Sequence, residues 1–131
     1  MTPLTVKPEP CPTCPYRKDV PSGVWHAEEY ERLRRYDQDG VVLGVFLCHQ
    51  SIVAGVDIVC KGWCVVHQDS IAVRLAMAQG QFDRSALDEP KVGLHESGNA
   101  AADFGQRDIE KPKRMALKVV EKLVRTGRFK T

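Results

Sequence analysis

Five cysteines, all in the first half of the chain, constrain most strongly what this sequence can fold into. Cys11 and Cys14 form a Cys-Pro-Thr-Cys turn, Cys48 follows alone, and Cys60 and Cys64 flank Lys-Gly-Trp. A Cys-x2-Cys turn presents two sulfurs from one short loop, and distant cysteines can complete a tetrahedral sulfur shell around a soft metal ion. The pattern therefore predicts a fold that is organised by a metal.

Length and composition are those of a small globular protein. The chain has 131 residues, of which 43% are hydrophobic and 27% are charged, so we expect one modest core supported by a metal staple. No apolar run approaches the roughly 20 residues that span a bilayer, and the first ten residues lack the apolar stretch of a secretion signal. We therefore expect a cytoplasmic protein without a membrane partner, where cysteines act as ligands or free thiols rather than disulfides.

The residue patterns predict a small α+β fold, with a loop-rich, metal-stapled N-terminal half that contains a short strand region and is followed by helices. Prolines and glycines in residues 1–24 predict an extended lead-in and an irregular loop. The other expected elements are a helix over 25–36, a strand over 41–47, a strand or loop over 52–59, a helix over 69–79 with Asp69 as N-cap, about one helical turn near 98–104, and a helix over 113–126.

The chain is expected to divide into a metal-binding domain, residues 1–109, and a basic C-terminal helix, residues 110–131, packed on the same domain. Residues 110–131 carry eight Lys or Arg against two Glu, whereas the whole chain has a net charge of only +2. Such a segment can bind nucleic acid or an acidic protein surface, or it can be a solvated helix face. The candidate nucleic-acid contacts are Lys113, Arg114, Lys118 and Lys122.

The candidate metal ligands have the spacing C-x2-C-x33-C-x11-C, formed by Cys11, Cys14, Cys48 and Cys60. Binding would clamp the N-terminal loop against two distant segments and would contribute directly to folding. The residues that compete for a place in the shell are Cys64, His49 and His67.

Zinc is the expected metal, because four thiolates in a cytosolic protein are typical of a structural zinc site. An iron–sulfur cluster uses the same ligands and is the alternative. A third interpretation, buried cysteines without metal, explains Cys48 but not the Cys11-Cys14 turn.

A thiol oxidoreductase that uses Cys11 and Cys14 is a further alternative. Redox pairs of this spacing follow a strand and begin a helix, whose dipole lowers the pKa of one thiol. Here ten proline-rich residues precede the pair and a loop follows it, which argues against this interpretation.

The chain resembles a family of small uncharacterised proteins of actinobacteria and their phages. The motifs that carry the resemblance span about residues 10–105: Cys11-Pro-Thr-Cys14-Pro-Tyr-Arg17, Pro21-Ser-Gly23, Cys48-His49, Cys60-Lys-Gly62-Trp63 and Ala72-Val-Arg74-Leu-Ala76. The resemblance implies Cys11, Cys14, Cys48 and Cys60 as the shared ligands and Cys64 as the spare sulfur. It implies no activity, and the basic segment lies outside it.

The sequence contains no glycine-rich phosphate loop, nucleophile elbow or paired-carboxylate arrangement. We therefore expect a small cytoplasmic four-cysteine protein that is not an enzyme. Its metal, zinc, would be structural, and the protein would act by binding nucleic acid or a host protein. The alternatives are an iron–sulfur protein that senses redox state or carries electrons, and the thiol oxidoreductase.

Overall fold

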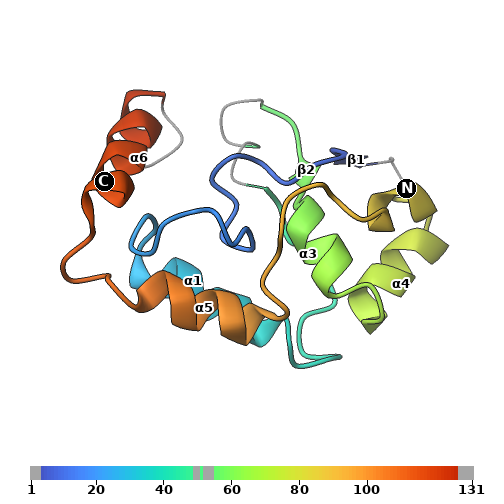
Figure 1. Cartoon of the computed structure of the whole chain (residues 1–131). Coiled ribbons are helices and arrows are strands. Elements are labelled where there is room, and N and C mark those ends of the chain that lie inside the picture. The colour runs from blue at the N-terminus through green and yellow to red at the C-terminus, as the bar shows by residue number, and fades with distance from the viewer. Residues whose placement is uncertain (1–3, 49–50, 52–54, 127–131) are drawn as a thin grey trace.

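The computed structural model describes residues 4–48, 51 and 55–126. The elements are β1 (Thr5–Val6), α1 (Ala27–Arg35), β2 (Ile58–Val59), α3 (Lys61–Val66), α4 (Ile71–Ala78), the 3-10 helix η1 (Arg84–Leu87), α5 (Gly98–Gln106) and α6 (Arg114–Arg125). Figure 1 shows α1 and α5 side by side, with α3 and α4 at one end of the molecule and α6 at the other. Helices around a very short sheet confirm the small α+β class.

The sheet consists of two parallel strands that pair with each other over two residues. Thr5 of β1 pairs with Ile58 of β2, and Val6 pairs with Val59. On the other side of β2, Leu47 forms one antiparallel bridge with Val59. The second expected strand is thus found at its C-terminal end, while residues 52–54 of that range lie outside the described residues.

The strand expected over residues 41–47 is wrong, apart from the bridge at Leu47. The reason is that β2 ends after two residues, where Cys60 caps α3, so the pairing stops at Phe46 and does not reach residues 41–45. Val41 and Leu43 are more than half exposed. A β-branched sequence favours a strand only where a partner strand offers its backbone.

The helices confirm most of the expected ranges within two residues and correct two details. α3 was not expected, because the glycine and bulky residues of Lys61–Val66 carry no helical pattern; it forms because the Cys60 sulfur accepts a hydrogen bond from Trp63 N at 3.4 Å. The N-cap of α4 is Ser70 rather than Asp69, since its hydroxyl accepts from Val73 N at 3.2 Å.

Small residues bring α1 and α5 into close contact. Ala101 and Ala102 are fully buried on the face of α5 that meets α1. A Cβ atom at Gly98 would overlap the carbonyl oxygen of Leu33, and one at Gly105 would overlap the ring of Tyr30. The two helices can therefore lie this close only because neither position carries a side chain.

Asp37 joins three parts of the fold just beyond the end of α1. Its carboxylate accepts hydrogen bonds from Gly98 N at 2.8 Å and Asn99 N at 2.7 Å, at the N-terminus of α5. It also lies 2.7 Å from Nε2 of His67, the C-cap of α3. Burial raises the pKa of this carboxyl, but the bonds from His67, Asn99 and Gly98 outweigh it and hold the pKa below its ordinary value of 3.8.

We expect Gly105→Ala to lower the free energy of unfolding by about 1–3 kcal/mol, the usual cost of overpacking a tight core. The added methyl group would push the Tyr30 ring away from α5. Gly44→Ala is the control, because a Cβ there meets nothing within 4 Å. Urea denaturation of both variants measures the difference, and equal stabilities would contradict the packing described.

Acid should weaken the fold through Asp37. A carboxyl whose folded pKa is lowered contributes stability above its unfolded pKa of 3.8, and this contribution is lost as the pH falls through the lower folded value. Asp37→Asn should therefore lower stability at pH 7 by about 1–3 kcal/mol and flatten the acid limb of the stability curve. Glu89→Gln, at an exposed acid, is the matched control. Urea melts from pH 3 to 7 test this; an unchanged acid limb in Asp37→Asn would refute it.

Candidate metal centre

The Cys11–Cys14 loop is a compact turn whose sulfurs lie inside the protein. Cys14 N donates to Cys11 O at 3.0 Å, and Arg17 N donates to Cys14 O at 3.0 Å. Cys11 is 6% exposed and Cys14 is 1% exposed. Because the backbone curls through hydrogen bonds of its own, the turn can present both side chains to the same side.

The α1–α5 pair holds this loop in place. The Trp25 indole donates to Thr13 O at 3.0 Å, between the two cysteines. The Tyr30 hydroxyl of α1 accepts from Val24 N at 3.2 Å and from Trp25 N at 3.1 Å. The position of the loop therefore depends on the same tyrosine that packs against Gly105.

Cys60 connects the turn between β2 and α3 to the Cys11–Cys14 loop. It stands between β2 and α3, is 3% exposed, and its Sγ lies 3.7 Å from the Sγ of Cys14. The approach needs Gly62, where a Cβ would lie 3.1 Å from Cys14 Sγ and 2.8 Å from Tyr16 Cβ. The glycine of the Cys-Lys-Gly-Trp motif thus has a role that the sequence analysis did not assign to it.

Cys11, Cys14 and Cys60 interact through their thiols. The pKa of Cys14 is raised well above its ordinary value, first by a hydrogen bond with Cys11, then by one with Cys60, and then by burial. Each of these neighbours would repel a thiolate at Cys14. A cluster of thiols that oppose one another's ionisation is the electrostatic situation that a bound cation reverses.

Cys48 shares a face with Cys60. The antiparallel bridge between Leu47 and Val59 is flanked by bonds from Cys48 N to Ile58 O at 2.6 Å and from Cys60 N to Phe46 O at 2.8 Å. Side chains alternate along extended strands, so this register puts Cys48 and Cys60 on the same side of the pairing, as diagonal neighbours. Cys48 is 7% exposed and lines a groove of about 360 Å³, which also reaches Arg32 and Tyr36.

The three alternates differ in position. Cys64 is fully buried one turn beyond Cys60, and burial, with a smaller effect from Cys60, raises its pKa to about 12. His67 directs Nε2 to Asp37, and its Nδ1 is buried with no hydrogen-bond partner in the described part of the chain. His49 lies outside the described residues.

The side chains around the sulfurs are mostly aromatic. Tyr16 is fully buried, with ring centroids 6.2 Å from Phe46 and 5.9 Å from His67. Burial, followed by repulsion from Cys60 and Cys14, raises the pKa of its hydroxyl. Trp63 is 1% exposed and follows Cys60 by three residues. The indole of Trp63 is therefore part of the core around the sulfurs.

Two basic residues near the cysteines in sequence, Arg17 and Lys61, bind oxygen atoms elsewhere in the protein. Arg17 makes two bonds of 2.7 Å with the carboxylate of Asp19 and one of 3.3 Å to Pro10 O, so it ties down the loop backbone. Lys61 is 3% exposed and donates to Ala86 O at 2.8 Å, in η1. The charge of Lys61 lowers the pKa of the Cys64 thiol, against the larger effect of burial, and no spacing rule in the sequence marks this lysine.

Metal geometry is only partly assembled. Within residues 4–48, 51 and 55–126, no three His, Cys, Asp or Glu side chains form a ready ligand group. The donor chemistry nevertheless fits: tetrahedral zinc with sulfurs about 2.3 Å away holds them about 3.8 Å apart, close to the 3.7 Å between Cys14 and Cys60. For one ion to bind all four sulfurs, the side chains of Cys11 and Cys48 would have to move toward the position between Cys14 and Cys60.

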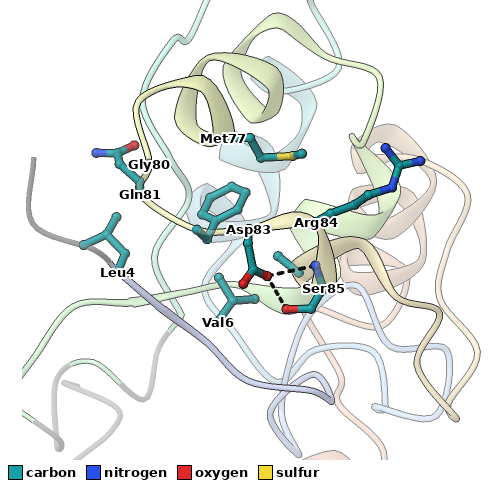
Figure 2. A pocket seen from close by; sticks show the side chains of 10 residues that line it. Leu4, Val6, Met77, Gly80, Gln81, Asp83, Arg84 and Ser85 are labelled. Atoms are coloured by element: carbon teal, nitrogen blue, oxygen red, sulfur yellow. Dashed lines mark hydrogen bonds between the residues drawn. The ribbon is translucent and has the colours of Figure 1, made fainter.

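A second concavity, of about 530 Å³, lies between β1 and η1 (Figure 2). Its lining is mixed, with Leu4, Val6 and Met77 facing Asp83 and Ser85. The Asp83 carboxylate already accepts from Ser85 N at 2.9 Å and from the Ser85 hydroxyl. The described lining contains no cysteine or histidine, so it offers no thiolate or imidazole ligand for a metal.

None of the helices in the described ranges is long and apolar enough to cross a membrane. No curated protein and no solved structure matches the chain significantly. One family model does match, over residues 6–125, which is nearly the whole chain and includes all five cysteines. The chain therefore belongs to DUF6283, a family of unknown function.

Proposed function

We propose that Cys11, Cys14, Cys48 and Cys60 bind one zinc ion, which stabilises the fold, and that the protein acts by binding another macromolecule. The observation that carries the proposal is the 3.7 Å separation between the Sγ atoms of Cys14 and Cys60, which are 46 residues apart. Two thiols from distant segments meet at the spacing that a single tetrahedral ion requires.

The spacing argues against a [4Fe–4S] cluster, in which each thiolate binds a different iron and the sulfurs lie farther apart than two sulfurs on one ion. A [2Fe–2S] cluster places two thiolates on each iron and has the same spacing, so iron and sulfide analysis distinguishes it from zinc. Four thiolates also fill a tetrahedral shell, and a catalytic zinc needs a position left open for water or substrate. A structural role therefore follows from the ligand set, and no reaction needs to be assigned to it.

The ion would hold three segments together: the Cys11–Cys14 loop, the extended segment that ends at Cys48, and the turn between β2 and α3. These segments share few backbone hydrogen bonds, namely the short pairings of β1, β2 and Leu47. The groove beside Cys48 offers an access route for the metal. In contrast, a redox role for Cys11 and Cys14 has little support, because such pairs begin a helix whose dipole lowers the pKa of one thiol, and the next helix here, α1, begins only at Ala27.

Metal analysis tests the proposal directly. Protein purified without oxygen and without added metal should contain one zinc per chain, and chelation should lower its melting temperature. Detection of iron together with acid-labile sulfide would show that the protein holds an iron–sulfur cluster instead of zinc. A chain that folds and melts identically with and without metal would overturn the proposal.

Two alanine variants distinguish ligand from spare sulfur. Cys60→Ala should lose the zinc, because it removes one of four ligands, whereas Cys64→Ala should keep it. The two positions are a matched pair, since both are almost fully buried and lie one helical turn apart. Zinc content and far-UV circular dichroism are the measurements, with Cys48→Ala as the test of the least assembled ligand. Retention of zinc by Cys60→Ala would exclude the proposed shell.

Gly62→Ala should weaken zinc binding without removing any ligand. The new methyl group would press on Cys14 Sγ and on Tyr16, and would separate Cys14 from Cys60. We expect zinc to transfer to a competing chelator at least about tenfold more readily, a change of about 1.4 kcal/mol. Gly93→Ala is the control, because a Cβ there makes only an ordinary contact of 3.6 Å with Lys18. Equal transfer from both variants would contradict the role of Gly62.

A further inference from the structure

α6 carries its basic side chains in one row. Arg114, Lys118, Lys122 and Arg125 are spaced four, four and three residues apart, so they fall within about 80° of the helix circumference. These four residues are called the basic row. Lys113 precedes the helix as its N-cap and lies outside the row.

The basic row faces solvent because the opposite side of α6 is buried. Ala116 and Leu123 are 0% and 2% exposed, and they lie roughly opposite the row on the helix. All four cations are exposed, and none forms an ion pair with another described residue. Glu121 is the acidic residue of the helix and stands at the edge of the row. The structure therefore presents four unneutralised positive charges on one face.

We propose that the basic row binds the phosphate backbone of a nucleic acid, without preference for sequence. The row extends over about 16 Å of helix, and a nucleic-acid strand carries a phosphate every 3.4 Å or so along its axis, so roughly five phosphates lie within reach. Each cation can thus meet a phosphate of its own.

The absence of apolar side chains within the row favours a nucleic acid over an acidic protein. Stable protein interfaces rely on buried aromatic or aliphatic anchors at their centre. Of the exposed apolar residues of α6, Leu117 and Val124 lie about 100° or more from the middle of the row, and Met115 lies about 60° from it, outside the row and next to Lys122. A row of cations without an apolar centre binds chiefly by releasing counterions from a polyanion, and this mode reads no bases.

This inference is independent of the zinc proposal. α6 lies at one end of the molecule, apart from α3, which follows Cys60 and lies beside α4 (Figure 1). Substitutions in the row can therefore be tested in the full-length, metal-loaded chain. Measuring the zinc content of every variant separates failure of the row from failure of the metal centre.

The experiment measures how salt weakens binding of a labelled 20-base-pair duplex and of its single strand, by fluorescence anisotropy. Four phosphate contacts predict a slope of log K against log [NaCl] of about −3.6 for the duplex and about −2.8 for the single strand. The double variant Lys118→Gln/Lys122→Gln should reduce the duplex slope to about −1.8. A shuffled duplex should bind within about twofold of the first, since backbone contacts carry no sequence information.

Two controls separate the row from total charge. Arg74→Gln/Lys91→Gln removes two exposed cations elsewhere, and Lys113→Gln removes one beside the row but outside it. Both should leave the slope unchanged. The proposal is overturned if the parent chain does not bind at 50 mM NaCl, if the controls lower the slope as much as the double variant, or if poly-glutamate of equal charge competes as well as DNA. The last result would assign the row to an acidic protein.

Discussion

The meeting of Cys14 with Cys60 is the contact on which the rest of this structure depends. It joins a loop near the N-terminus to the turn between β2 and α3, and it is possible only because Gly62 leaves room for the sulfur. The chain has little regular sheet to hold these segments together. Covalent or coordinate links commonly compensate for a small core in proteins of this size. The zinc ion that we propose would supply such a link at the thiol cluster.

The α1–α5 helix pair supports the contact between Cys14 and Cys60 through hydrogen bonds to the segments that carry these cysteines. Gly98 and Gly105 let α5 approach α1, which brings the Tyr30 hydroxyl to the backbone of Val24 and Trp25. The Trp25 indole then holds the carbonyl of Thr13, between the first two cysteines. On the other side, Asp37 connects the N-terminus of α5 to His67 at the end of α3. The α1–α5 pair therefore positions both the Cys11–Cys14 loop and α3, the helix that follows Cys60.

Much of the fold was predictable because helices depend on local patterns. The ranges expected for α1, α4 and α6 agree with the structure within two residues, since an apolar face repeats at helical spacing in each. The strand over 41–47 failed because strand formation needs a partner, and β2 is too short to supply one. α3 escaped prediction because its stabilising features are a sulfur cap at Cys60 and burial against the core, which no local pattern reveals.

For the candidate site, the sequence by itself determined the ligand types and their chemistry: five thiols, two of them in a Cys-x2-Cys turn, and a basic C-terminal segment. Only the tertiary structure decided which thiols meet, because the distance between Cys14 and Cys60 depends on Gly62, on the α1–α5 packing and on the bridge beside Cys48. It also decided which cations of the last helix share a face, since burial of Ala116 and Leu123 sets the rotation of α6. Residue chemistry is a local property, whereas proximity results from packing between segments distant in the chain.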